Sequence, residues 1–105
     1  MSAEMQAKKI SSIAVQLREF IGHEAEIRIT DVAGKDPVAP GKRFTLHDVK
    51  LSPEHTHLIC CLNEAQHISI PIYDQTSLLS IEQGLRLVSE DRLAELIYTL
   101  QITYA

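Results

Sequence analysis

The chain of 105 residues lacks tryptophan and has few other aromatic residues, three tyrosines and two phenylalanines. Because hydrophobic residues still make up 45% of the sequence, the core must be built from isoleucine, leucine and valine. No apolar run approaches the ~20 residues of a membrane-spanning helix, and the first residues lack the apolar stretch of a signal peptide. We therefore expect a cytoplasmic protein without a membrane segment, folded as a single domain over residues 1–105.

Cysteine is equally scarce, since Cys60 and Cys61 are the two in the chain, and they are adjacent. A disulfide between neighbouring residues is strained, and thiols in the cytoplasm stay reduced. The absence of a Cys-x-x-Cys pair excludes the zinc-ribbon and thioredoxin-like motifs. The sequence therefore predicts no structural disulfide.

Basic residues are outnumbered, because 10 lysines and arginines stand against 14 aspartates and glutamates and give a formal net charge of −4. A protein that binds the phosphate backbone usually carries a net basic surface. Nucleic acid is therefore a poor candidate for a partner.

One basic cluster lies in a loop rich in glycine and proline, which contains Lys35, Lys42 and Arg43. A P-loop needs four residues between its glycines, followed by Lys and then Ser or Thr. Here six residues separate Gly34 from Gly41, Arg43 occupies the Ser/Thr position, and a strand pattern follows. The loop is thus no nucleotide site. We expect a solvated loop, and weak contact with an anion is the alternative.

Apolar spacing predicts the elements in the first half of the chain. Residues 3–21 form an amphipathic helix, because their apolar side chains recur at helical spacing. Residues 24–30 alternate as a half-buried strand does. Residues 43–51 form a second strand, in which the apolar positions change parity at His47 and Asp48 and so predict a bulge or a sharp bend.

Residues 55–62 and 67–73 are predicted to pair as a hairpin. Their even-numbered apolar residues fall on one face if the strands agree in parity, which requires a connection of three or five residues. Pro71 lacks the N–H that a ladder needs, so it marks an edge or a bend.

The last third of the chain is less regular. Residues 74–84 show no clear pattern, residues 85–88 suit a short strand, and Ser89 can cap a helix that ends near residue 96. A last strand follows to about Tyr104. The expected fold class is α+β, with an N-terminal amphipathic helix packed on a small, strongly bent antiparallel sheet or an SH3- or Sm-like barrel of four or five strands, a short C-terminal helix and a last strand.

Four residues of the hairpin carry metal-binding or nucleophilic side chains, namely His55, His57, Cys61 and His67. The hairpin could bring them together as zinc ligands. Their spacing matches no standard ligand motif, however, and Cys61 with a nearby histidine lacks the context of a catalytic pair. We therefore expect no metal, no cofactor and no enzymatic activity, with the histidines on a solvated or subunit-facing surface.

The function that we favour is a small non-enzymatic interaction module that forms a homodimer. The hairpin has a second face, with Ile59, Pro71 and Tyr73, which no other predicted element clearly covers and which is the candidate dimer interface. An unknown protein could also bind there. Two alternatives stay open: an RNA- or anion-binding small barrel that uses the loop at residues 31–43, and a metal-binding protein.

Overall fold

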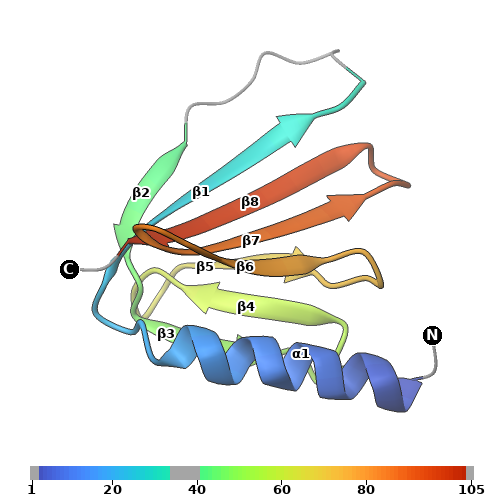
Figure 1. The fold of residues 1–105 in the computed structure, drawn as a ribbon, viewed down its shortest axis with the longest axis horizontal. Coiled ribbons are helices and arrows are strands. Elements are labelled where there is room, and N and C mark those ends of the chain that lie inside the picture. The colour runs from blue at the N-terminus through green and yellow to red at the C-terminus, as the bar shows by residue number, and fades with distance from the viewer. Residues whose placement is uncertain (1–2, 34–40, 104–105) are drawn as a thin grey trace.

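One helix and eight strands make up the part of the chain that the computed structural model describes, residues 3–33 and 41–103. The strands form two antiparallel sheets (Figure 1). The elements in chain order are α1 (Ala3–Arg18), β1 (Glu24–Asp31), β2 (Lys42–Thr45), β3 (Asp48–Leu51), β4 (His57–Cys61), β5 (His67–Pro71), β6 (Ser77–Ile81), β7 (Gly84–Asp91) and β8 (Leu96–Thr103).

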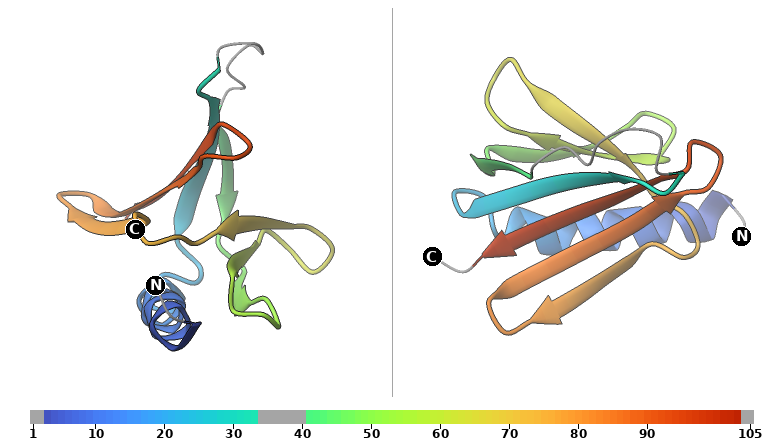
Figure 2. Two further views of the ribbon diagram at one scale, coloured as in Figure 1. Left: turned by 90° about the vertical axis from the view of Figure 1, so that its right-hand side faces the viewer. Right: turned by 90° about the horizontal axis from the view of Figure 1, so that it is seen from above.

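The larger sheet has five strands in the order β2-β1-β8-β7-β6, and the smaller has three in the order β3-β4-β5. The chain passes from one sheet to the other between β2 and β3 and again between β5 and β6, but the two sheets do not close into a barrel (Figure 2). The helix α1 packs on β3 and β4. The α+β class is therefore confirmed, whereas the expected barrel and the count of four or five strands are wrong.

The core lies between the sheets and α1, and it is aliphatic as the composition requires. The buried residues of α1 recur at spacings of three and four and form the predicted stripe. Each fully buried Leu or Ile stabilises the fold by about 1.5–3 kcal/mol relative to an exposed one. Buried core residues include Ile10, Ile13, Ala14 and Leu17 of the helix and Ala25, Ile27, Leu58, Ile70, Leu87, Leu100 and Ile102 of the sheets.

The helix ends at Arg18, before the expected residue 21. Gly22 adopts a φ of 94°, a left-handed conformation that glycine tolerates, and its N–H donates to the Leu46 carbonyl at 2.8 Å. The turn after α1 is thereby tied to the segment that leads into β3.

The predicted bend is confirmed as the point where the chain changes sheets. Leu46 and Val49 differ in parity, yet both are buried. The Leu46 N–H donates to the His23 carbonyl and the His47 N–H donates to the Cys61 carbonyl, each at 2.9 Å. Adjacent residues therefore bond to different parts of the fold, which turns the strand direction between β2 and β3.

The hairpin of β4 and β5 also follows its predicted parity. Leu58 pairs with Ile70 and Cys60 pairs with Ile68, so the two apolar sets share one face. Residues 62–66 connect the strands, which is the longer of the two lengths that equal parity allows.

Within the described residues, the expected C-terminal helix is replaced by strands. Residues 74–84, expected to be irregular, contain β6 and the turn into β7, and β7 continues well beyond residues 85–88. The prediction failed because Ser89 resembles a helix cap in sequence, whereas its side chain is fully buried on the inner face of β7. The expected last strand is confirmed as β8, which lies at the centre of the larger sheet.

Candidate functional site

The four candidate metal ligands do not converge on one point. His57 and Cys61 lie at opposite ends of β4, which places them about 13 Å apart in an extended strand. His67 pairs with Cys61, and His55 lies in the turn before β4 with a backbone φ of 58°. In the described part of the chain, no group of three or more histidine, cysteine, aspartate or glutamate residues is arranged to hold a metal ion.

The thiol of Cys60 is poorly suited to catalysis. Its side chain is buried on β4, opposite Ile68. Burial, and to a smaller extent the neighbouring Cys61, raises the pKa of the Cys60 thiol from 9.0 to about 12. Because the thiolate is the nucleophilic and metal-binding form, a thiol that stays protonated at neutral pH packs as a small hydrophobic side chain.

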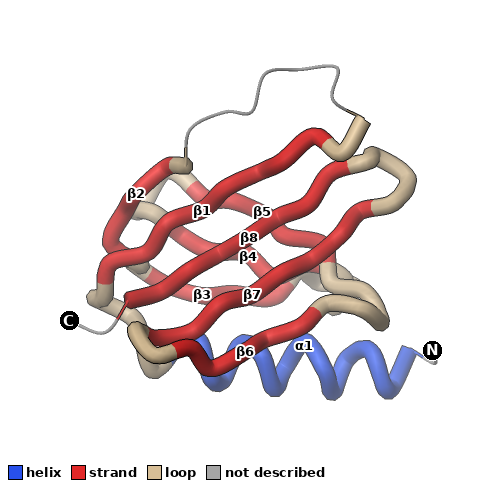
Figure 3. The backbone as a smooth tube through the Cα atoms, turned by 45° about the horizontal axis from the view of Figure 1, so that its top comes forward, coloured by secondary structure: helices blue, strands red, loops and turns tan. Residues whose placement is uncertain are grey.

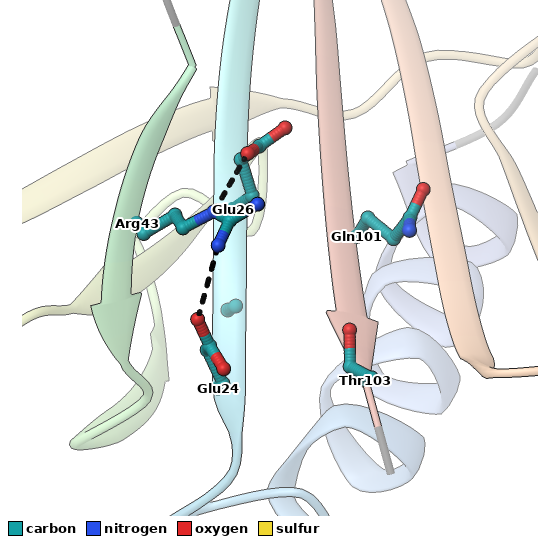
Figure 4. Close-up of a pocket in the computed structure, with 6 residues that line it drawn as sticks. Glu24, Glu26, Arg43, Gln101 and Thr103 are labelled. Atoms are coloured by element: carbon teal, nitrogen blue, oxygen red, sulfur yellow. Dashed lines mark hydrogen bonds and ion pairs between the residues drawn. The ribbon is translucent and has the colours of Figure 1, made fainter.

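Among the three candidate anion-binding residues, Lys35 lies outside the described residues, and Lys42 is exposed at the start of β2. Arg43 faces two carboxylates of β1, with its Nε 3.3 Å from Glu26 Oε2 and its Nη1 3.9 Å from Glu24 Oε1 (Figure 4). These three residues line a hollow of about 310 Å³ on the outer face of the larger sheet. Two carboxylates against one guanidinium leave its lining net negative, which disfavours an anion.

Two of the three candidate dimer-interface residues are engaged inside the domain. Pro71 is buried, and its carbonyl accepts a hydrogen bond from the Ser89 hydroxyl. Tyr73 is half-buried, and burial, followed by the charge and the hydrogen bond of Asp91, raises the pKa of its phenol. Ile59 is half-buried on β4. Pro71 and Tyr73 therefore connect the end of β5 to β7.

A chain of hydrogen bonds holds this junction together. The single proton of the Ser89 hydroxyl goes to the Pro71 carbonyl, so Thr76 must be the donor in the 2.9 Å contact between Thr76 Oγ1 and Ser89 Oγ. Thr76 Oγ1 in turn accepts from the Tyr73 N–H at 2.8 Å. Lys9 Nζ adds a 2.9 Å bond from α1 to the Tyr73 carbonyl. The junction between β5 and β6 is therefore fixed to both β7 and α1.

Three of the four edges of the two sheets carry charged side chains or proline. The edge strand β2 contains Lys42 and Arg43, β3 contains Asp48 and Lys50 and is contacted by α1, and β5 contains Pro71. Features of this kind keep an edge strand from pairing with another chain.

The fourth edge, β6, has no such protection. Among the described strands it pairs with β7 alone, and it lies at the border of the larger sheet (Figure 3). Its sequence, Ser-Leu-Leu-Ser-Ile, contains neither charge nor proline, and Leu79 at its centre is 52% exposed. This strand is not apparent from the sequence because the adjacent Leu78 and Leu79 hide the alternation that marks a strand.

Apolar surface extends from this edge across the outer face of the larger sheet. In the register of the sheet, Leu79 and Ile81 of β6, Val88 of β7 and Ile97 of β8 share that face. Val88 is the diagonal neighbour of both Leu79 and Ile97, and diagonal neighbours lie within reach of long side chains. We term these four residues, together with the free edge of β6, the β6–β8 surface.

The fold and this surface define a small α+β protein with two antiparallel sheets, and its described helix is too short and too polar to cross a membrane. No protein-family model and no curated protein matches the sequence. A solved structure, that of the YojF protein of Bacillus subtilis, has a similar fold, with a TM-score of 0.56 over 90% of this chain and 89% of that chain. The two sequences are 13% identical, so the likeness concerns the fold alone.

Proposed function

We propose that this chain is a small cytoplasmic, non-enzymatic interaction module that forms a homodimer through the β6–β8 surface. The observation that carries the proposal is the uncharged edge of β6, with Leu79 exposed at its centre. An edge of this kind is a template for strand pairing with another chain, and folded proteins otherwise protect it. The other edges of this fold have that protection, so the exposure of β6 is specific to one strand.

A second copy is the partner that this surface fits, because a two-fold contact needs only one self-complementary patch. A contact over β6 would remove Leu79 and Ile81 from water, and it could extend to Val88 on the next strand. Arg86 of β7 lies directly opposite Leu79 in the sheet. Its Nη2 donates a hydrogen bond to Gln101 Oε1 at 3.2 Å. Its charge is thus oriented toward the centre of the sheet rather than toward the edge.

Binding is favoured over catalysis by the chemistry of the side chains. The Cys60 thiol is buried with a raised pKa, and the hollow beside Arg43 holds an ion-paired guanidinium without a histidine, cysteine or lysine in its lining. Both cysteines are free thiols, which fits the reducing cytoplasm.

Sedimentation equilibrium of two matched variants tests the proposal. The wild-type chain is expected to be a dimer at micromolar concentration, and Leu79→Lys is expected to be a monomer, because two ammonium groups would meet at the two-fold contact without partners. Val15→Lys is the control, since Val15 is a similarly exposed apolar residue on α1, at 58%, and this variant should remain dimeric. A monomeric wild-type protein at high micromolar concentration would overturn the proposal.

A further inference from the structure

We infer that β6 pairs with β6 of a second copy in antiparallel fashion, about a two-fold axis that passes beside Leu79, and so joins two five-stranded sheets into one continuous sheet. The inference rests on the proposed self-association through the β6–β8 surface and specifies its geometry. The register follows from the faces and charges of the residues on and beside β6.

Symmetry limits the registers that are available. A two-fold axis perpendicular to the sheet keeps the outer face of one copy on the same side as the outer face of the other. Directly opposed residues of an antiparallel pair also point to the same side. Outer-face residues such as Ser77, Leu79 and Ile81 must therefore pair with one another, and Leu78 and Ser80 must pair with one another.

The register centred on Leu79 satisfies these conditions along the whole strand. Leu79 then meets Leu79 of the second copy, Ser77 meets Ile81, and Leu78 meets Ser80. All five residues of β6 take part. The exposed side chain of Leu79 packs against its own copy, and cross-strand pairs of this kind are the unit that stabilises a sheet.

Moving the two-fold axis by one residue in either direction gives a less favourable register. Centring the axis on Leu78 brings Glu82 opposite Asp74, and directly opposed like charges are destabilising. Centring it on Ser80 places Leu78, which packs against the hydrophobic core, opposite the carboxylate of Glu82. Either shift also leaves only the three residues around the new centre paired within β6.

Cysteine crosslinking reads out the register directly. In the register centred on Leu79, Leu79→Cys places two thiols in directly opposed positions, where Cβ atoms are close enough for a disulfide. Treatment with oxidised glutathione is expected to yield a covalent dimer on a non-reducing gel. The native cysteines interfere little because both are buried.

Two further variants provide matched tests. Ser77→Cys and Ile81→Cys should each fail to crosslink alone, because residue 77 of one copy lies a strand length from residue 77 of the other. An equimolar mixture of the two should crosslink, because Ser77 opposes Ile81. Val15→Cys on α1 is the negative control, and circular dichroism confirms that each variant is folded.

The outcomes separate this inference from the proposed function. If the wild-type chain sediments as a dimer and Leu79→Lys as a monomer, but Leu79→Cys fails to crosslink, the β6 register is overturned and the proposed self-association through the β6–β8 surface stands. A crosslink of Ser80→Cys with itself, in place of that of Leu79→Cys, would also overturn the register. A wild-type monomer would refute both the inference and the proposed function.

Discussion

Removal of the Ser89 hydroxyl should weaken the junction between the two sheets. Ser89 is fully buried, donates to the Pro71 carbonyl and accepts from Thr76. Ser89→Ala removes both bonds, and it leaves a buried carbonyl and a buried hydroxyl proton without these partners. Because the substitution deletes a single oxygen atom, the steric disturbance is small and the loss is one of hydrogen bonding.

The magnitude follows from the number of groups left without a partner. A buried donor or acceptor without a hydrogen bond costs about 1–3 kcal/mol. Part of this cost is offset in Ser89→Ala because the hydroxyl itself no longer has to be removed from water on folding. We expect the free energy of unfolding to fall by about 1–3 kcal/mol, which for a domain of this size lowers the Tm by roughly 5–15 °C.

Urea unfolding followed by circular dichroism measures this loss. The m-value should stay constant because the surface exposed on unfolding is unchanged, while the midpoint falls. Ser69→Ala is the control, since Ser69 is exposed on β5. In a double-mutant cycle, Ser89→Ala and Thr76→Val should be less than additive because the two hydroxyls share one bond. A Ser89→Ala midpoint equal to that of the control would refute the assigned hydrogen-bond chain.

Two further predictions concern the core and pH. Ile70→Asp should abolish the thermal transition because Ile70 is fully buried opposite Leu58. Ser69→Asp, on the exposed face of β5, should retain the transition. Equal loss of the transition in both variants would show that the faces of β5 are wrongly assigned. Because burial raises the pKa of Cys60, the unfolded thiol ionises near pH 9.0, whereas the folded thiol stays protonated to about pH 12. The free energy of unfolding should therefore fall as the pH rises through this range, by up to about 1.4 kcal/mol per pH unit. Urea unfolding at neutral and alkaline pH checks this: Cys60→Ala should lack this part of the fall, and an equal pH dependence in both proteins would contradict it.

The sequence by itself determined the elements in which spacing along the chain assigns each side chain to a buried or an exposed face. The apolar spacing of α1 predicts its buried stripe, and the parity change at His47 and Asp48 marks the change of sheet. The common parity of β4 and β5 predicts that their apolar residues share one face and that the connection has three or five residues, of which the structure has five. In each case the period of 3.6 or 2 residues assigns side chains to a face, and no distant strand is needed to do so.

Tertiary structure alone decided which strands are neighbours, and the candidate surface depends on that choice. Ser89 carries the signature of a helix cap, but pairing of β7 with β8 places it in a strand. Arg43 is one of several basic residues in the sequence, and its ion pair with Glu26 forms across 17 positions of the chain. β6 is an unprotected edge because β7 lies on one of its sides and no described strand lies on the other. Strand order arises from hydrogen bonds between residues far apart in the chain, so the pattern within five residues can predict a strand but not its position at an edge.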